Sequence, residues 1–280
     1  MAENSVKVAN VDLVGAGDLT FEPKQMDVQR YTHKSGVCVT WEGDGWYDEC
    51  RSWFVSSYIH AGISGFQMTV WGPEAQDLLS SLHINNVYKW PIGKCKHLVS
   101  LDDEGLITNH ALYMRDSEDT FRTTAGIPNA VIGAIESGSF KAEYKIDFVY
   151  VFQFSGPKSL TILEKLTETD LHDVGFLETR MVTIPSLGLE SELCRIGMSG
   201  TLAYELRGPK EDGPAVYAAA LAAGKEYGIK RLGWRSYPVN HSFGGFPQQT
   251  CSFNTALYKD PIFREASLEI FTPTGSVDPE

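Results

Sequence analysis

The sequence predicts an α+β fold in which antiparallel sheets are flanked by helices, and a threefold repeat is the first observation behind it. In each copy an alternating apolar run leads into a Gly-Pro pair and then a helical run; the pairs are Gly72-Pro73, Gly156-Pro157 and Gly208-Pro209. Glycine lets the chain turn out of a strand, and proline is tolerated in the first turn of a helix. We therefore expect each glycine to end a strand and a helix to begin soon after each proline, with the third helix delayed by Pro214.

The second observation is a β-meander between the first two copies of the repeat. Residues 95–101, 106–115 and 120–125 read as its strands, and Asp102–Gly105 supplies the first tight turn. Residues 128–137 have the pattern of a short helix. Strands and helices that are grouped in this way are typical of an α+β protein.

These signals predict two interleaved units. Residues 51–144 form an inserted, ferredoxin-like α+β unit, and residues 1–50 together with 145–250 form an outer α+β unit. Residues 251–280 form a C-terminal extension with a frayed end.

Composition narrows the classes of partner. The chain has 280 residues and a formal net charge of −12 at pH 7. Because nucleic acid and anionic membranes bind basic faces, this charge argues against both as partners. Met1–Lys7 lack a signal-peptide pattern, and no apolar run approaches the roughly 18 residues of a membrane span. Five scattered cysteines indicate reduced thiols, and 14 Phe, 12 Tyr and 6 Trp suit a pocket for a flat ligand. We expect a cytoplasmic enzyme with a small aromatic substrate; homo-oligomer formation stays open.

Several well-known chemical motifs are missing from the sequence. It contains no GxGxxG after a strand, no GxxxxGK[ST], no HExxH and no GxSxG. Its seven histidines are not spaced so that two of them would share one helix face. We therefore expect no metal site and no nucleotide-phosphate loop, with chemistry carried by ordinary side chains.

Four segments resemble the glycine-cleavage T-protein (aminomethyltransferase) family. Residues 194–206 resemble its R-x-G-Y-T-G-E-x-G-[YF]-E stretch, residues 70–75 its V-x-G-P-D-A, and residues 103–107 its N-E-x-G-[GI]-I turn. Residues 233–240 share the G-x-R-x-Y-P-x-N pattern of the tetrahydrofolate-dependent aryl O-demethylases, the branch that the chain resembles most. The resemblance implies a T-protein-like fold and one-carbon chemistry.

The departures from the family pattern concern its acidic residues. Thr108 and Asn109 stand where T-proteins carry an Asp pair that positions the one-carbon unit at the folate nitrogen. Thr201 stands at the pterin-contacting Glu, and His241 replaces an acid in the D-x-L-R-x-E run. The family also closes its folate site with a C-terminal β-barrel, which we do not expect here. These departures imply no cofactor and no tight binding of tetrahydrofolate.

Three functions follow from this comparison of patterns. A methyl group needs an acceptor, whereas a hydroxymethyl carbon leaves as formaldehyde once a base takes its hydroxyl proton. The first hypothesis is therefore a cofactor-independent carbon–carbon lyase that releases formaldehyde from a lignin-derived aromatic of the phenylcoumaran or diaryl type. The second is a tetrahydrofolate-dependent aryl O-demethylase or aminomethyltransferase, and the third is a non-catalytic binding subunit.

Four residues are candidates for catalysis. Tyr237 would manage a proton with the help of His60 or His241, and Arg195 would stabilise a departing phenolate through its planar fork of donors. Because Tyr237 precedes proline, we expect an extended backbone there. Structural roles stay open: a buried tyrosine, an ion pair of Arg195 with Glu205, and core or surface histidines.

Candidate substrate-binding residues surround these four. Only one of Asn109 and His110 faces the site on an alternating strand, and we choose Asn109. Residues 241–247 are expected to form a flexible aromatic loop over a flat substrate, although a plain connection stays open. The substrate-binding set is Asn109, Trp234, Arg235, Asn240 and Phe246.

Overall fold

The computed structural model describes most of the chain between residues 30 and 261. The described residues are 30–34, 37–61, 65–124, 128–247, 253, 255–259 and 261. The C-terminal extension expected over 251–280 therefore falls almost entirely outside them, as do residues 1–29. Within the described ranges, no helix is long and apolar enough to cross a membrane.

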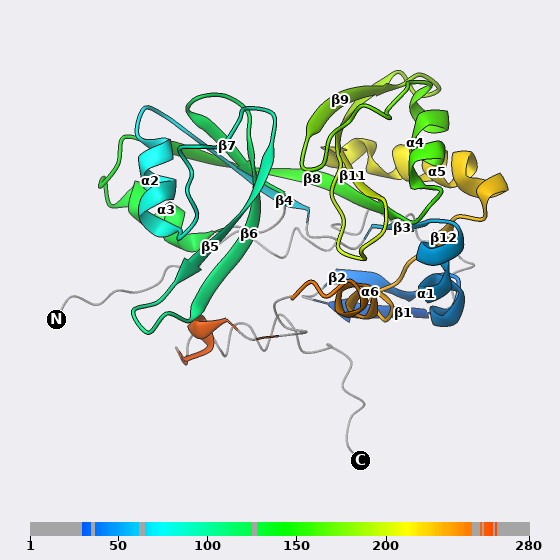
Figure 1. Ribbon diagram of the computed structural model, residues 1–280, viewed down its shortest axis with the longest axis horizontal. Coiled ribbons are helices and arrows are strands. Elements are labelled where there is room, and N and C mark those ends of the chain that lie inside the picture. Colours follow the sequence, from blue (N-terminus) through cyan, green and yellow to red (C-terminus); the bar gives the residue numbers. More distant parts are fainter. Residues whose placement is uncertain are drawn as a thin grey trace, which may run out of the picture.

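Ten strands of the described chain form one continuous sheet, and its centre is the 13-residue strand β8 (Glu143–Ser155). The first part of β8, up to Phe148, pairs with β4 (Phe66–Trp71). The rest of β8 pairs with β11 (Ala203–Pro209), and its end also pairs with β3 (Tyr58–His60). β8 therefore joins two halves of the molecule that have separate helices and separate cores (Figure 1).

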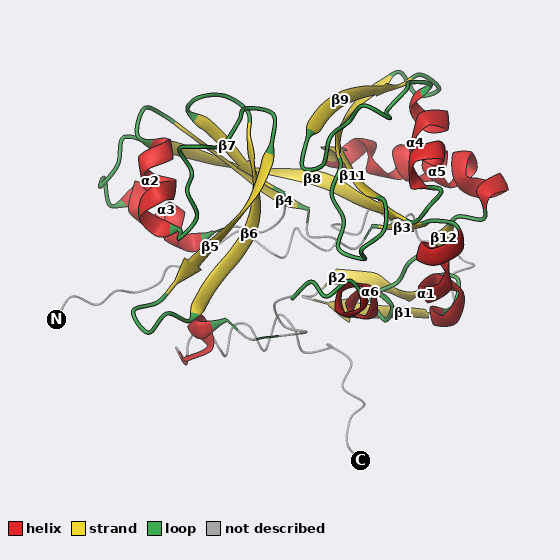
Figure 2. Cartoon of the chain, in the orientation of Figure 1, coloured by secondary structure: helices red, strands yellow, loops and turns green. Residues whose placement is uncertain are grey.

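In the first half, two helices pack against the β5-β6-β7-β4 part of the sheet (Figure 2). The elements are α2 (Ala75–Leu82), β5 (Cys95–Leu101), β6 (Ile107–Arg115), β7 (Thr120–Thr123) and α3 (Asn129–Glu136). The predicted meander and the helix expected over 128–137 are confirmed. The turn forms as expected because the Asp102 carboxylate accepts hydrogen bonds from the backbone N–H groups of Glu104 and Leu106.

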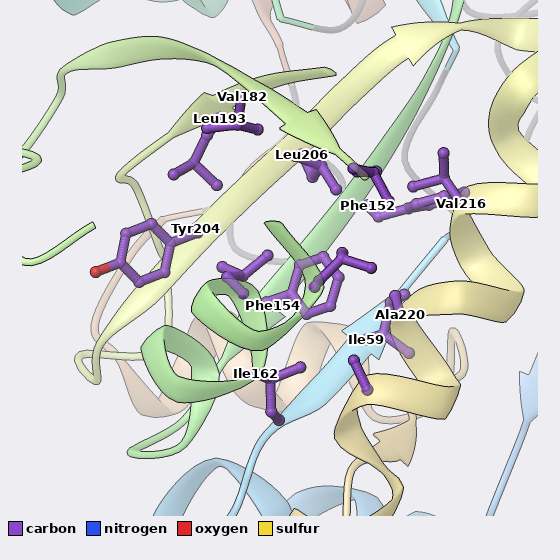
Figure 3. Packing of buried hydrophobic residues seen from close by; sticks show 14 of the residues in the cluster. Ile59, Phe152, Phe154, Ile162, Val182, Leu193, Tyr204, Leu206, Val216 and Ala220 are labelled. Atoms are coloured by element: carbon purple, nitrogen blue, oxygen red, sulfur yellow. The ribbon is translucent and has the colours of Figure 1, made fainter. Parts of the chain in front are cut away.

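In the second half, apolar side chains from one face of the sheet pack against two helices. The further elements are α4 (Ser159–Thr167), β9 (Thr179–Ile184), β10 (Leu189–Cys194), α5 (Gly213–Gly224) and β12 (Lys230–Arg231). Figure 3 shows Phe152, Phe154 and Leu206 of the sheet beside Ile162 of α4 and Val216 of α5. The other face of this half is therefore left for polar residues.

A third, smaller layer lies beside the second half (Figure 1). It contains the hairpin of β1 (Arg30–Lys34) and β2 (Val37–Glu42), helix α1 (Trp46–Val55) and helix α6 (Tyr237–Phe243). Trp53, Tyr58, Leu232 and Tyr237 form its core. Short 3₁₀ turns complete the described elements at η2 (Lys210–Asp212), η3 (Lys225–Tyr227) and η4 (Ala256–Lys259).

The predicted Gly-Pro repeat is confirmed, and with it the α+β class. Gly72 and Gly156 directly follow β4 and β8, and the next helices begin at Ala75 and Ser159. Gly208 lies at the end of β11, and α5 follows after the short turn η2. The chain passes from strand to helix in the same way at all three places.

The structure corrects two expectations about the segment around Tyr237. Tyr237 begins helix α6 and is not extended, because Pro238 occupies the first turn, where a helix needs no backbone donor. His241–Phe243 form the end of the same helix, so the first part of the expected aromatic loop is helical. The sequence also gave no signal that we recognised for β1, β2, β9, β10 and α1.

The division of the chain at residues 51 and 144 stays a prediction. Strand pairing changes partners elsewhere: β3 pairs with the second part of β8, and β4 pairs with its first part. By hydrogen bonding, the chain therefore enters the first half between β3 and β4 and leaves it near Phe148.

Gly156 offers a test of how the repeat is built. Its φ is 134°, and a Cβ there would lie 2.4 Å from the carbonyl oxygen of Ser56. We expect Gly156→Ala to lower the free energy of unfolding by about 3 kcal/mol, because backbone strain adds to a clash with backbone atoms. The control is Gly188→Ala, where φ is 65° and no atom lies within 4 Å, with an expected cost of about 1 kcal/mol. Equal urea midpoints for the two variants would contradict this interpretation.

Candidate functional site

The second half of the sheet has a buried polar face opposite its apolar core. Strand register pairs His60 with Gln153, Gln153 with Glu205, and Glu205 with Cys194, so the four lie in one row across β3, β8, β11 and β10. All four are buried. We call this row, together with Tyr58, Arg207 and Glu192 on the same side, the polar face.

Strands β5 and β6 of the first half lie against the polar face. The Cys194 Sγ is 3.3 Å from the Sγ of Cys95 on β5, and an Arg207 nitrogen donates to the Met114 sulfur on β6 at 2.8 Å. Cys95 and Cys194 are free thiols. Contacts from both halves of the molecule therefore enclose the polar residues.

Glu205 and Arg207 form a buried ion pair on the polar face. The Glu205 carboxylate lies 2.6 Å from an Arg207 guanidinium nitrogen, and both side chains are almost fully buried. Burial raises the pKa of Glu205, and the neighbouring Arg207 charge opposes that rise. This pairing also answers one open question, because the acid considered as a partner for Arg195 is bound to Arg207.

Helix α6 docks on the polar face at the other end of the row. The buried Tyr58 hydroxyl lies 2.7 Å from Gln153 Oε1 and 3.1 Å from Asn240 Oδ1. Asn240 is itself fully buried, and its Nδ2 has no hydrogen-bond partner among the described residues. A buried amide in this condition is an available group for a ligand.

Three of the four predicted catalytic residues meet where α6 covers β3. The Tyr237 ring stacks on the His60 ring, with centroids 4.3 Å apart and planes inclined by 20°. The His241 ring packs edge-on against the Tyr237 ring, with centroids 4.2 Å apart. Trp234 packs edge-on against both His60 and Tyr237. We call His60, Tyr237 and His241, three of the residues predicted to be catalytic, the catalytic cluster.

Hydrogen bonds to carbonyl groups fix the tautomers of both histidines in the catalytic cluster. Nδ1 of His60 donates to the Leu232 carbonyl at 2.8 Å, and Nδ1 of His241 donates to the Tyr237 carbonyl at 3.0 Å. Each neutral ring therefore carries its lone pair on Nε2. Burial lowers the pKa of His241, so its neutral form, a base, persists at neutral pH.

A second histidine pair, which sequence reasoning missed, lies next to the catalytic cluster. His97 on β5 and His110 on β6 share a hydrogen bond of 3.0 Å, and both rings contact Phe246. Phe246 also contacts His241, with centroids 6.2 Å apart. The predicted pairing of the two strands could have revealed this pair. His97 is opposite Leu112 and His110 is opposite Val99, so the two histidines are diagonal neighbours.

The remaining predicted residues lie outside this group of rings. Asn109 alternates with His110 and shares its face of β6 with Ala111 and Tyr113, which pack in the core of the first half. The structure thus brings His110, and not Asn109, to Phe246.

Both predicted arginines have other partners. Arg195 donates to the carbonyl of Val174, a residue of the core on the opposite side of the sheet. Arg235 is exposed, forms a 2.6 Å ion pair with Glu42 and lies over the Trp46 ring. The catalytic role of Arg195 and the substrate-binding role of Arg235 stay predictions.

One group of possible metal ligands lies in the described ranges, on the surface. Glu164, Asp170 and His172 place their ligand atoms within 4.8 Å of one another. The His172 Nδ1 lies 2.8 Å from Glu164 and 3.0 Å from Asp170, and the hydrogen bond to Asp170 raises the pKa of the imidazole. Ion pairing accounts for this cluster, and we assign no metal to it.

The His97–His110 pair predicts a pH dependence of stability. Burial, and then the neighbouring His110, lower the pKa of His97 from 6.5 to about 4. Between these values the unfolded chain binds the proton and the folded chain does not, so stability falls as the pH falls from 6.5 towards 4. Urea denaturation at several pH values gives the free energy of unfolding across this window. We expect His97→Gln to reduce the slope of that free energy against pH by at most about 1 kcal/mol per pH unit. His172→Gln, an exposed control at a histidine whose pKa is raised and not lowered, should not flatten the slope; equal slopes for wild type and His97→Gln would refute the interpretation.

Comparisons with known proteins identify the family. Residues 44–240, well over half of the chain, match the family model described as the GCVT N-terminal domain. A sesamin methylene transferase of Sinomonas sp. (strain No.22) is 33% identical over 210 residues, which cover 74% of this chain and 46% of that protein. A syringate O-demethylase of Sphingobium sp. (strain NBRC 103272 / SYK-6) is 29% identical over 218 residues, which cover 71% of this chain and 46% of that protein.

A solved structure has the same fold. The crystal structure of glycine cleavage system aminomethyltransferase T from Bartonella henselae matches with a TM-score of 0.63 at 16% identity, covering 76% of this chain and 58% of that one. This chain spans about half the length of the two curated relatives. Because the family model covers well over half of the chain, the chain belongs to the GCVT N-terminal domain family.

Proposed function

We propose that this protein removes a one-carbon group from an oxygen-bearing aromatic substrate and passes it to tetrahydrofolate. The observation that carries the proposal is the catalytic cluster, in which His60 and His241 pack against Tyr237 next to the polar face. The relatives support it, because one is named a methylene transferase that acts on sesamin and another an O-demethylase that acts on syringate.

The catalytic cluster supplies the proton transfers that this reaction needs. Cleavage of an aryl ether leaves an electron pair on the aryl oxygen, and a nearby hydroxyl donor stabilises that charge. Tyr237 is the donor in this scheme, and its hydroxyl proton goes to the departing oxygen. The Nε2 lone pair of His60 or His241 would take the proton that the acceptor amine loses and return it to Tyr237, because Nδ1 of each ring is bound to a carbonyl group.

The polar face offers hydrogen-bonding groups of the kinds that the edge of a pterin ring requires, since that edge carries both donors and acceptors. Asn240 Nδ2 is a buried donor and Glu192 Oε1 a buried acceptor, and neither has a hydrogen-bond partner in the described ranges. Asn240 Nδ2 and the Glu205 carboxylate would hold the ring, because Gln153 is the neighbour of both Tyr58 and Glu205. When bound, tetrahydrofolate supplies the amine nitrogen that accepts the carbon.

Glu205 is the reason for revising the expectation of no cofactor. The chain lacks the family's acids at Thr108, Thr201 and His241, and from the sequence we considered Glu205 only as a partner for Arg195. A buried carboxylate in the same row as His60 restores an acceptor of the kind that pterin recognition requires.

A formaldehyde-releasing lyase is the second candidate, and one observation favours it. Where T-proteins carry an Asp pair, Thr108 has only a hydroxyl, and Asn109 lies on the face of β6 that belongs to the core of the first half. In this reaction a histidine of the catalytic cluster takes the proton of a primary hydroxyl, and the C–C bond to that carbon breaks. The electron pair forms a conjugated double bond and expels an aryl ether oxygen, which Tyr237 protonates.

The two candidates differ in their need for an acceptor. We expect purified protein to demethylate or demethylenate aromatic ethers only when tetrahydrofolate is added, with the carbon recovered on folate. The measurement is product analysis by mass spectrometry with a parallel formaldehyde assay, on methoxylated, methylenedioxy and hydroxymethyl-bearing two-ring compounds. Formaldehyde release without folate would replace the proposal by the lyase, and no turnover of any compound would contradict both.

Tyr237→Phe tests the catalytic cluster in either reaction. We expect kcat to fall by about 10²–10⁴-fold, because a proton-transfer group is lost while the ring and its stacking on His60 remain. Tyr204→Phe, a buried tyrosine in the apolar core of the same half, is the matched control and should retain kcat within about threefold. Near-normal turnover of Tyr237→Phe would show that Tyr237 has a structural role.

A further inference from the structure

The fully buried carboxylate of Glu49 accepts four hydrogen bonds from two distant chain segments. Its Oε1 accepts from the backbone N–H groups of Gly43 at 2.8 Å and Asp44 at 3.1 Å. Its Oε2 accepts from the backbone N–H of Gly233 at 3.1 Å and from the Ser236 hydroxyl at 2.6 Å. Glu49 thereby ties the start of α1 to the turn that precedes α6.

The two segments approach so closely that the contact leaves no room for adjustment. A Cβ at Gly233 would lie 2.2 Å from the carbonyl oxygen of Trp41, so only glycine fits there. The backbone N–H groups of Trp234 and Arg235 also donate to the carbonyls of Thr40 and Trp41. These contacts hold the turn over residues 233–236 against the end of β2, and the hydrogen bonds of Glu49 hold it against the start of α1.

This turn orients two members of the catalytic cluster. The Leu232 carbonyl, one residue before the turn, accepts the hydrogen bond that fixes the His60 ring. Tyr237 directly follows Ser236, and its backbone N–H donates to the Gly233 carbonyl at 3.2 Å. Both rings of the 4.3 Å stack thus depend on a segment that Glu49 holds.

We propose that Glu49 is a positioning residue for the reaction, which sets the orientation of Tyr237 relative to His60 through the turn at residues 233–236. The inference rests on the proposed function of the catalytic cluster. Glu49 acts through hydrogen bonds to the backbone and to Ser236, without touching the substrate. Displacement of a reacting group by about 1 Å costs on the order of 10²-fold in rate, so a small shift of this turn has a large effect.

The arrangement requires a carboxylate in this place. Each oxygen of Glu49 faces two donors, and a carboxylate is an acceptor at both oxygens. In Glu49→Gln, either orientation of the amide turns an NH₂ group towards two donors. The variant keeps the size of the side chain and loses at least one of the four hydrogen bonds, because the Ser236 hydroxyl can turn to accept from the amide whereas a backbone N–H cannot.

The kinetic test combines Glu49→Gln with Tyr237→Phe in the full-length protein. We expect Glu49→Gln to lower kcat by about 10²-fold with KM changed less than about threefold, because the loss is in orientation. In the Tyr237→Phe background the same change should cost less than about threefold, because Glu49 acts through Tyr237. Equal losses in both backgrounds would overturn the proposal.

Asp44→Asn is the matched control for general loosening of the two segments. Asp44 pairs with Arg231 and therefore links the same parts of the chain, without holding the turn at residues 233–236. We expect this variant to lower the melting temperature and to retain kcat within about threefold. A loss of kcat as large as that of Glu49→Gln would mean that Glu49 is only one of several structural contacts, and it would overturn the proposal.

A spectroscopic measurement tests positioning without any turnover. Because Tyr237 stacks on His60, its ring protons should be shifted upfield in NMR spectra of protein labelled at tyrosine rings, and Tyr237→Phe identifies the signal. We expect Glu49→Gln to reduce this shift. If Glu49→Gln fails to fold, Ser236→Ala replaces it. This variant removes one of the four donors and should reduce the upfield shift of the Tyr237 signal to a smaller extent. An unchanged Tyr237 signal would overturn the proposal, whereas an inactive wild type with the expected shift would contradict only the proposed function.

Discussion

The unbroken strand β8 is the constraint on which the site depends. Its 13 residues pair with β4 in one half of the molecule and with β11 and β3 in the other, so the two halves cannot separate without breaking one strand. The polar face of the second half is consequently held against β5 and β6. For this reason the catalytic cluster, which belongs to the second half and the third layer, lies next to the His97–His110 pair of the first half.

Enclosed polar groups of this kind contribute little to stability, which is consistent with the proposed binding site. A buried ion pair such as Glu205–Arg207 is often no more stabilising than well-packed apolar residues. Asn240 and Glu192 each keep one buried polar atom without a partner in the described ranges, which costs about 1–3 kcal/mol per group. Glu49, by contrast, is buried with four donors, so its contribution is to geometry. Buried polar atoms without partners and buried ion pairs are expected at a binding site.

Much of the fold could be predicted because its signals are local. The turn at Asp102–Gly105 and the three Gly-Pro pairs each act through the few residues around them, and the elements next to them were predicted closely. The helix at Tyr237 was missed because its proline sits in the first turn, where proline favours a helix as readily as a break.

The site could be predicted only in part, because its geometry depends on register and packing. His60, Tyr237 and His241 were selected for their chemistry, and docking of α6 on β3 brings them together. The choice of Asn109 over His110 required knowledge of which face of β6 is buried, and Tyr113 and Leu98 decide that through the core of the first half. Glu49 carried no signal at all, since the groups that it binds lie up to 187 residues away.

The proposed function requires the substrate to bind at the catalytic cluster on the polar face. A crystal structure of the protein with an aromatic ether substrate or a substrate analogue tests this requirement. We expect an aromatic ring next to Tyr237, with the Tyr237 hydroxyl within about 3 Å of the ether oxygen. A ligand bound at a separate place, with Tyr237 and His60 still covered by protein, would contradict it.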